Sequence, residues 1–188
     1  MGRNRRVWQP GVAYHVTFRG NQRANLYRDD HDYEVFLQLL NLTNNKYPYN
    51  LYAFCLMPNH YHLLLSTDDT SLSKVMARIN KGFANYFNTR YGVTGHVFEK
   101  RFYSNPVTEG YGLAYVSRYI HNNPVTANLT TDPAHYPWSS YPQYLSAEER
   151  KNSICPVKIA RILSAYKGKA VEKRQQYQRF MESTIFGG

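Results

Sequence analysis

The 188-residue chain is long enough for one domain with its own core, and its 43% hydrophobic content without low-complexity tracts excludes a disordered protein. No apolar run could span a bilayer and the N-terminus "MGRNRRVWQPG" lacks the centre of a signal peptide, so we expect a cytoplasmic protein. The net charge of +10 and the 18 tyrosines favour a nucleic-acid partner, whereas a basic protein whose tyrosines only pack is the plainer alternative.

The predicted elements follow from hydrophobic periodicity and from turn residues. Alternation indicates strands, a 3.6-residue repeat indicates helices, and Gly, Pro and Asn mark turns. In chain order they are a strand at 13–20, a helix from 29–30 that is closed by 48, strands at 51–57 and 60–66, a helix at 72–91, β structure at 95–107, a helix at 112–123 stopped by Pro124, and two helices from 156 onward that are split near 168. This order predicts an α+β fold in which an antiparallel sheet carries helices on one face.

The C-terminal part differs from the rest in composition. A loop rich in proline and aromatic residues, "AHYPWSSYPQY", precedes a segment with many Lys and Arg and few acids. We predict a main domain over 1–145 and a basic helical extension over 146–188. The two cysteines, Cys55 and Cys155, do not form a disulfide framework and are interpreted as small buried hydrophobes.

Two histidines stand in the hairpin sequence "FCLMPNHYHLLLS". Residues i and i+2 of a strand share a face, so His60 and His62 project together and Tyr61 points the opposite way. Two imidazoles placed in this way can share a divalent cation, although such a pair can also be a packed or surface feature. No Cys or His cluster completes a zinc site, so a third ligand must come from another element. For His15, on the first strand, approach to this pair and a packing role are equally open.

The helix before Pro124 offers that third ligand. Tyr115, Tyr119 and Asn123 recur every four residues and share one stripe of the helix, which is either core packing or a functional face. A phenol ionises only near pH 10, but a cation that binds a phosphate stabilises the transition state for attack on it. Together the two elements predict a metal-bound phosphate facing a tyrosine nucleophile, and spacing does not separate Tyr115 from Tyr119.

The motif "LMPNHYHLLL" resembles the histidine–hydrophobic–histidine (HUH) signature of single-tyrosine HUH transposases. Four further blocks, "YHVTFRGN", "GHVFEKRFYS", "RYIHNNPV" and "YPWSSY", resemble those of the REP-associated tyrosine transposases, in the same order, over about residues 3–144. This resemblance implies a ferredoxin-like α+β fold with the HUH motif on a central strand. It also implies that the domain over 1–145 is the catalytic one.

The resemblance implies a DNA-nicking and strand-transfer enzyme of the cytoplasm, either monomeric or homodimeric. It implies Mg²⁺ or Mn²⁺ held by His60, His62 and Asn123, with Tyr119 as the catalytic nucleophile. Such enzymes cleave single-stranded DNA at hairpins of repetitive extragenic palindromes (REPs), leaving a 5′-phosphotyrosine and a free 3′-OH. This chain departs from the family pattern at Glu99 and over 126–128, which bears on DNA recognition rather than on the proposed ligands.

Basic residues in several parts of the chain are predicted to contact DNA. They are Arg3, Arg5, Arg6, Arg19, Arg23, Lys74, Arg78, Lys81, Lys100, Arg101 and Arg118. Two alternatives use the same charge and aromatic content: a catalytically inactive protein that binds hairpin DNA and regulates expression, and an RNA-binding protein.

Overall fold

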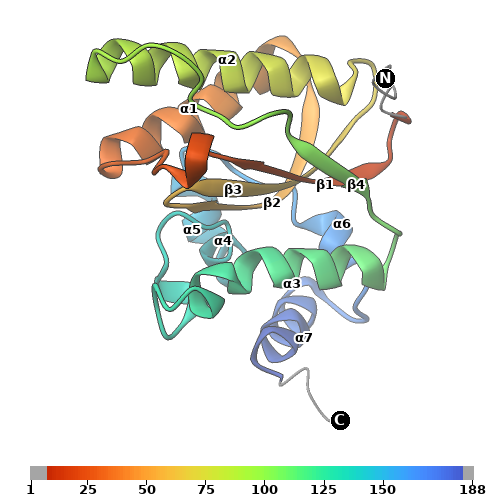
Figure 1. Ribbon diagram of the computed structural model, residues 1–188. Coiled ribbons are helices and arrows are strands. Elements are labelled where there is room, and N and C mark those ends of the chain that lie inside the picture. The colour runs from red at the N-terminus through yellow and green to blue at the C-terminus, as the bar shows by residue number, and fades with distance from the viewer. Residues whose placement is uncertain (1–7, 184–188) are drawn as a thin grey trace.

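A four-stranded antiparallel sheet forms the centre of the molecule (Figure 1). The computed structural model describes residues 8–183, apart from the side chains at 150 and 152. The strands are β1 (Ala13–Arg19), β2 (Tyr49–Met57), β3 (His60–Thr67) and β4 (Tyr103–Pro106), in the spatial order β2-β3-β1-β4. This is the strand order of ferredoxin-like folds, and the predicted α+β fold is confirmed.

Helices cover both faces of the sheet. Helices α1 (Asp30–Lys46) and α2 (Leu72–Tyr91) lie on one face, and α3 (Tyr111–Thr126) lies on the other (Figure 1). The expectation of helices on one face only is therefore wrong. The physical reason is that the inner strand β3 and most of β2 are buried on both sides, so each face needs an apolar cover.

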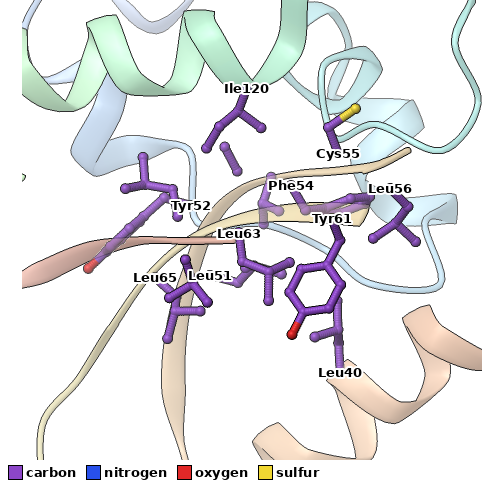
Figure 2. Close-up of a cluster of buried hydrophobic side chains, with 14 of the residues drawn as sticks. Leu40, Leu51, Tyr52, Phe54, Cys55, Leu56, Tyr61, Leu63, Leu65 and Ile120 are labelled. Atoms are coloured by element: carbon purple, nitrogen blue, oxygen red, sulfur yellow. The ribbon is translucent and has the colours of Figure 1, made fainter. Parts of the chain in front are cut away.

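Alternate residues of β3 serve these two layers. Figure 2 shows Tyr61, Leu63 and Leu65 on the side of Leu40 from α1, whereas Ile120 approaches from α3 on the other side. All five side chains are fully buried. The sheet is consequently held between two packed layers, so side chains at the ends of its strands project from a rigid support.

Two boundaries differ from those that the sequence predicts. Only the last part of the predicted β segment 95–107 is a strand, because Phe98 turns inward and stacks on Phe18 with ring centroids 4.4 Å apart. Pro124 lies inside α3 rather than ending it. The proline has no N–H to donate to the Ile120 carbonyl, and its ring is buried in the core, so packing offsets the loss of one helical hydrogen bond.

The C-terminal segment packs against α3 through several short elements. After the 3₁₀ turn Pro133–His135 come α4 (Pro142–Leu145), α5 (Ala147–Asn152), α6 (Ala160–Leu163) and α7 (Ala170–Glu182). Gly168, with φ of +103°, separates α6 from α7, near the predicted split. The buried Tyr177 hydroxyl of α7 lies 2.8 Å from His121 Nδ1 and 2.9 Å from Ser117 Oγ, both on α3. The division at residue 145 stays a prediction, since both parts share one core.

His121 also ties α3 to the sheet. Its Nε2 lies 2.8 Å from Ser140 Oγ, and that hydroxyl accepts a hydrogen bond from the Phe54 amide of β2. Helix α3 is thus fixed from both sides, and the residues on its exposed stripe have a defined position relative to β3. Among residues 8–183, no helix combines the length and the apolar content that crossing a membrane requires.

Candidate active site

A pocket of about 770 Å³ opens between the sheet, helix α3 and the segment that joins α2 to β4. It contains the two motif histidines, the predicted nucleophile and the predicted amide ligand together. Its lining residues are His15, Thr17, Phe18, Arg19, His60, His62, Glu99, Lys100, Arg101, Tyr103, Asn105, Tyr119 and Asn123.

The histidines occupy the face of β3 that the alternation rule assigns to them. His60 pairs in register with Arg19, and His62 pairs with Thr17, so both imidazoles stand beside β1. Their ring centroids lie 5.0 Å apart. Tyr61 is buried in the opposite layer, as predicted.

Hydrogen bonds hold the Nδ1 atom of each motif histidine. His60 Nδ1 lies 2.7 Å from the Asn59 side-chain oxygen, which can only accept, so the proton of this ring stands on Nδ1. His62 Nδ1 lies 2.9 Å from His15 Nε2. The His62 Nε2 atom is buried and has no hydrogen-bond partner among the described residues. With protons on Nδ1, both rings keep the Nε2 lone pair for a ligand.

His15 belongs to this site, although the sequence left its role open. Its ring stacks on that of His62 with centroids 5.2 Å apart, and it meets the Tyr119 ring edge-on at 5.8 Å. The contact follows from the antiparallel register, in which Thr17 faces His62 and His15 is the next residue on the same face of β1. The register was the missing signal, because a strand pattern does not state which residue of another strand lies opposite.

Burial keeps the three imidazoles neutral. It lowers the pKa of His62 to about 3, with a further contribution from neighbouring His60, and it lowers the pKa of His15 to about 4. Burial and the nearby Arg19 charge lower the pKa of His60 to about 4. At neutral pH the rings therefore present lone pairs instead of positive charge.

Tyr119 faces the histidines, and Tyr115 does not. The Tyr119 ring meets His62 edge-on, with centroids 5.7 Å apart, and its side chain is 57% exposed. Tyr115 lies outside the pocket and packs against Phe180 of α7 at 5.1 Å. Tertiary packing thus brings one of the two candidate tyrosines to the site.

Asn123 lies one turn beyond Tyr119 on the same stripe of α3. Its side-chain nitrogen donates a 2.7 Å hydrogen bond to the Tyr119 carbonyl, so its side-chain oxygen is left for another partner. Asn123 is close enough to His62 to act on its pKa, as a minor effect that opposes burial. The predicted ligand set of two imidazoles and one amide therefore converges on one pocket.

The predicted DNA-contacting residues are spread over the molecule. Arg19, Lys100 and Arg101 line the pocket, and Arg23 is exposed in the 3₁₀ turn Asn21–Arg23. Exposed Lys74, Arg78 and Lys81 lie on α2, in the layer that covers the other face of the sheet. The predictions for Arg3, Arg5 and Arg6 lie outside the described residues.

Arg118 is not brought to the pocket. It is 5% exposed, its guanidinium lies 4.7 Å from the Phe180 ring centroid, and it donates to the backbone carbonyls of Met181 and Ser183. Arg118 lies outside this pocket because it faces the C-terminal helix α7, whereas Tyr119 is on the exposed stripe of α3. The DNA contact expected of Arg118 stays a prediction.

The family model described as "Transposase IS200 like" matches residues 9–123 of this chain, which include all four proposed site residues. The chain belongs to this family. A relative from Haemophilus influenzae (strain ATCC 51907 / DSM 11121 / KW20 / Rd), "Putative REP-associated tyrosine transposase", is 26% identical over 160 residues, covering 79% of this chain and 90% of the relative. The resemblance that the five sequence blocks indicate is confirmed.

A solved structure shows the same fold. It is the "Structure of the REP associates tyrosine transposase bound to a REP hairpin", which covers 90% of this chain and 93% of its own, with a TM-score of 0.66 and 17% identity. A "putative transposase" structure from Deinococcus radiodurans covers 65% of this chain and 97% of its own, with a TM-score of 0.43 and 18% identity. The first likeness covers nine tenths of this chain.

Proposed function

We propose that this IS200-like transposase family member is a metal-dependent endonuclease and strand transferase that cleaves single-stranded DNA at REP-type hairpins through Tyr119. One observation carries the proposal: the exposed Tyr119 phenol stands edge-on to His62, whose buried Nε2 lacks a partner among the described residues, in a pocket lined by Arg19, Lys100 and Arg101. A nucleophile, vacant nitrogen ligands and phosphate-binding cations are what a tyrosine-based DNA nicking site needs.

The donor set fits a divalent ion of the Mn²⁺ or Mg²⁺ kind. In the described part of the chain, no three His, Cys, Asp or Glu side chains form a metal cluster, so the set depends on the amide oxygen of Asn123. His60 and His62 would supply one nitrogen each, and the unpartnered Nε2 of His62 is explained by such an ion. Three protein ligands leave coordination positions for phosphate oxygens. When bound, the ion would orient the scissile phosphate and neutralise part of its charge.

The chain's own residues would carry out an exchange at phosphorus. As the bond between the Tyr119 oxygen and phosphorus forms, the bond from phosphorus to the 3′ oxygen breaks. The phenol loses its proton to water and the departing 3′ oxygen gains one, giving a free 3′-OH and a 5′-phosphotyrosine. Because the phosphodiester is exchanged rather than hydrolysed, a later 3′-OH can attack the phosphotyrosine and rejoin the strand.

The substrate is inferred from charge and from the relatives. Arg19, Lys100 and Arg101 would bind phosphates of the DNA. Glu99 lines the same pocket and would repel a phosphate placed beside it, which would make the site selective among DNA strands. The Haemophilus relative is named for its association with REP elements, and the transposase of the matched structure is bound to a REP hairpin. Both support hairpin DNA as the substrate of this chain.

Incubation with a labelled DNA hairpin and Mn²⁺ tests the proposal. We expect a covalent protein–DNA species that survives denaturation, and no such species with His62→Ala. The matched control is His96→Ala, which removes an exposed histidine in the segment before β4 and leaves the adduct intact. An unreactive native chain, or adduct formation by His62→Ala, would overturn the proposal. A hairpin of the same sequence in RNA separates it from an RNA-processing function.

A further inference from the structure

Three neighbouring hollows lead from the candidate active site to the helical layer of α1 and α2. The second, of about 490 Å³, lies between α2 and the segment before β4, and the third, of about 450 Å³, lies between α1 and α2. The first and second share Phe18, Lys100 and Arg101, and the second and third share Ala77. We call these three neighbouring hollows the trough; the segment between α2 and β4, which lines its middle part, runs back beneath α2 in Figure 1.

The trough is strongly basic along its whole length. Its cations are Arg19, Lys74, Arg78, Lys81, Lys100 and Arg101, and the only acid among its described lining residues is Glu99, beside the active site. Helix α2 contains no Asp or Glu in its 20 residues. In residues 8–183, no ion pair is formed by Lys74, Arg78 or Lys81. Cations that the chain itself does not neutralise attract a polyanion.

Apolar and aromatic groups form the walls between these charges. Phe18 and Phe102 border the second hollow. In the third, Lys74 Nζ lies 4.7 Å from the Tyr47 ring centroid, and Leu42 is 58% exposed. Phe102 is 7% exposed and Phe18 already stacks on Phe98, so these rings form an apolar wall of the second hollow, and phosphate contacts of the cations would carry strand binding.

We propose that the trough holds the single-stranded DNA that continues beyond the scissile phosphate, leading it from Tyr119 past Lys100 and Arg101 to α2. The α2 portion, from Ser73 to Asn85, is about 18 Å long at 1.5 Å per residue. The inference rests on the proposed function for its starting point. It adds a strand-binding path on the face of the sheet opposite to the histidines.

Binding of fluorescent hairpins tests this path. The variant is the triple change Lys74→Ala, Arg78→Ala and Lys81→Ala, measured in a Tyr119→Phe background so that cleavage does not interfere. The DNAs are one hairpin with short flanks and the same hairpin with a long single-stranded flank on its 5′ or its 3′ side. We expect one of the two long-flank DNAs to bind the triple variant about 10- to 100-fold more weakly than it binds the Tyr119→Phe parent, near 0.1 M salt. The slope of log affinity against log salt should fall by about 2, because each lost phosphate contact contributes roughly 0.7. The short-flank hairpin should bind unchanged.

A matched control removes the same charge elsewhere: Lys151→Ala, Lys167→Ala and Lys169→Ala change exposed lysines outside the trough. The trough proposal is overturned if the control weakens binding equally, if the short-flank hairpin loses as much affinity, or if the triple variant loses none. With Tyr119 present, the triple variant should still form the covalent adduct on the short-flank hairpin. Failure of the native chain to form that adduct would refute the proposed function and leave the binding result standing.

Discussion

The two faces of β3 use the same strand for opposite purposes. Toward α1 and α2, Tyr61 is fully buried and its hydroxyl donates a 2.6 Å hydrogen bond to the Asn80 side-chain oxygen. Toward α3, His60 and His62 border an open pocket, with their Nδ1 atoms held and their Nε2 atoms facing potential ligands. Residues only one position apart therefore belong to a sealed layer and to a pocket that is open to ligands.

The same contrast separates two tyrosines. Burial raises the pKa of Tyr61 well above its ordinary value, so its phenol stays neutral and serves packing. Tyr119 is more than half exposed and faces the pocket that contains His60 and His62. The comparison teaches that the closed face supplies rigidity, and under the proposed function the open face would supply chemistry, which a site built on a strand of a packed sheet requires.

The largest effect is expected from the phenol on the open face. Tyr119→Phe removes the attacking oxygen and should reduce the covalent adduct below detection, with hairpin affinity changed by less than about twofold because one exposed hydroxyl contributes little to binding. Gel analysis after denaturation measures the adduct. Tyr115→Phe, the control one turn away, should retain it. If Tyr119→Phe still formed the adduct, another residue would be the nucleophile, and the contrast between the two faces of β3 would not hold.

A smaller effect is expected from His15, which positions His62 through the 2.9 Å contact between their ring nitrogens. His15→Phe keeps a ring in place but removes the hydrogen bond, and should weaken Mn²⁺ binding by about 10- to 100-fold. His15→Gln, which can still accept a hydrogen bond, should lose less. Titration of bound Mn²⁺ by electron paramagnetic resonance measures both. Equal losses in the two variants would assign His15 a packing role only.

On the closed face, Tyr61→Phe should affect stability and leave chemistry unchanged. The change removes the hydrogen bond to Asn80 and should lower the free energy of unfolding by about 1 kcal/mol, because the amide oxygen stays behind with one partner fewer. Urea denaturation measures this loss. The adduct should form at the native rate, and a strong loss of adduct at full folding would show that the two faces are coupled.

The smallest effect on metal binding is expected from acidification. A histidine with an ordinary pKa near 6.5 loses metal as the pH falls to about 5.5, but the folded pKa values of about 3 for His62 and about 4 for His60 keep both neutral there. Mn²⁺ affinity should therefore change by less than about threefold between pH 7.5 and 5.5. Isothermal titration calorimetry can follow it. A decline centred near pH 6.5 would mean that the histidines are solvated.

Stability should respond to the same acidification in a defined direction. The folded pKa of His62 lies below that of the unfolded chain, so the unfolded state binds protons first as the pH falls. The stabilising contribution is complete above about pH 6.5 and is lost progressively toward about pH 3. We therefore expect the free energy of unfolding to fall over a pH range in which the Mn²⁺ affinity of the folded protein stays constant. Both results together would indicate that the histidine rings are buried and neutral.

The sequence by itself determined the features that depend on local periodicity. Alternation in "HYHLLLS" put His60 and His62 on one face and Tyr61 on the other, and the four-residue repeat put Tyr119 and Asn123 on one helical stripe. The hairpin, the long helix α2 and the α+β class follow in the same way, because strand and helix geometry relate neighbours along the chain.

Only the tertiary structure decided between features that local geometry leaves equal. Strand register brought His15 to His62, and the docking of α3 put Tyr119 at the histidines while Tyr115 met α7 and Arg118 became buried. The second helical layer and the trough also arise from packing between segments far apart in sequence. The physical reason is that periodicity fixes directions within one element, whereas contacts between elements depend on how their buried faces fit together.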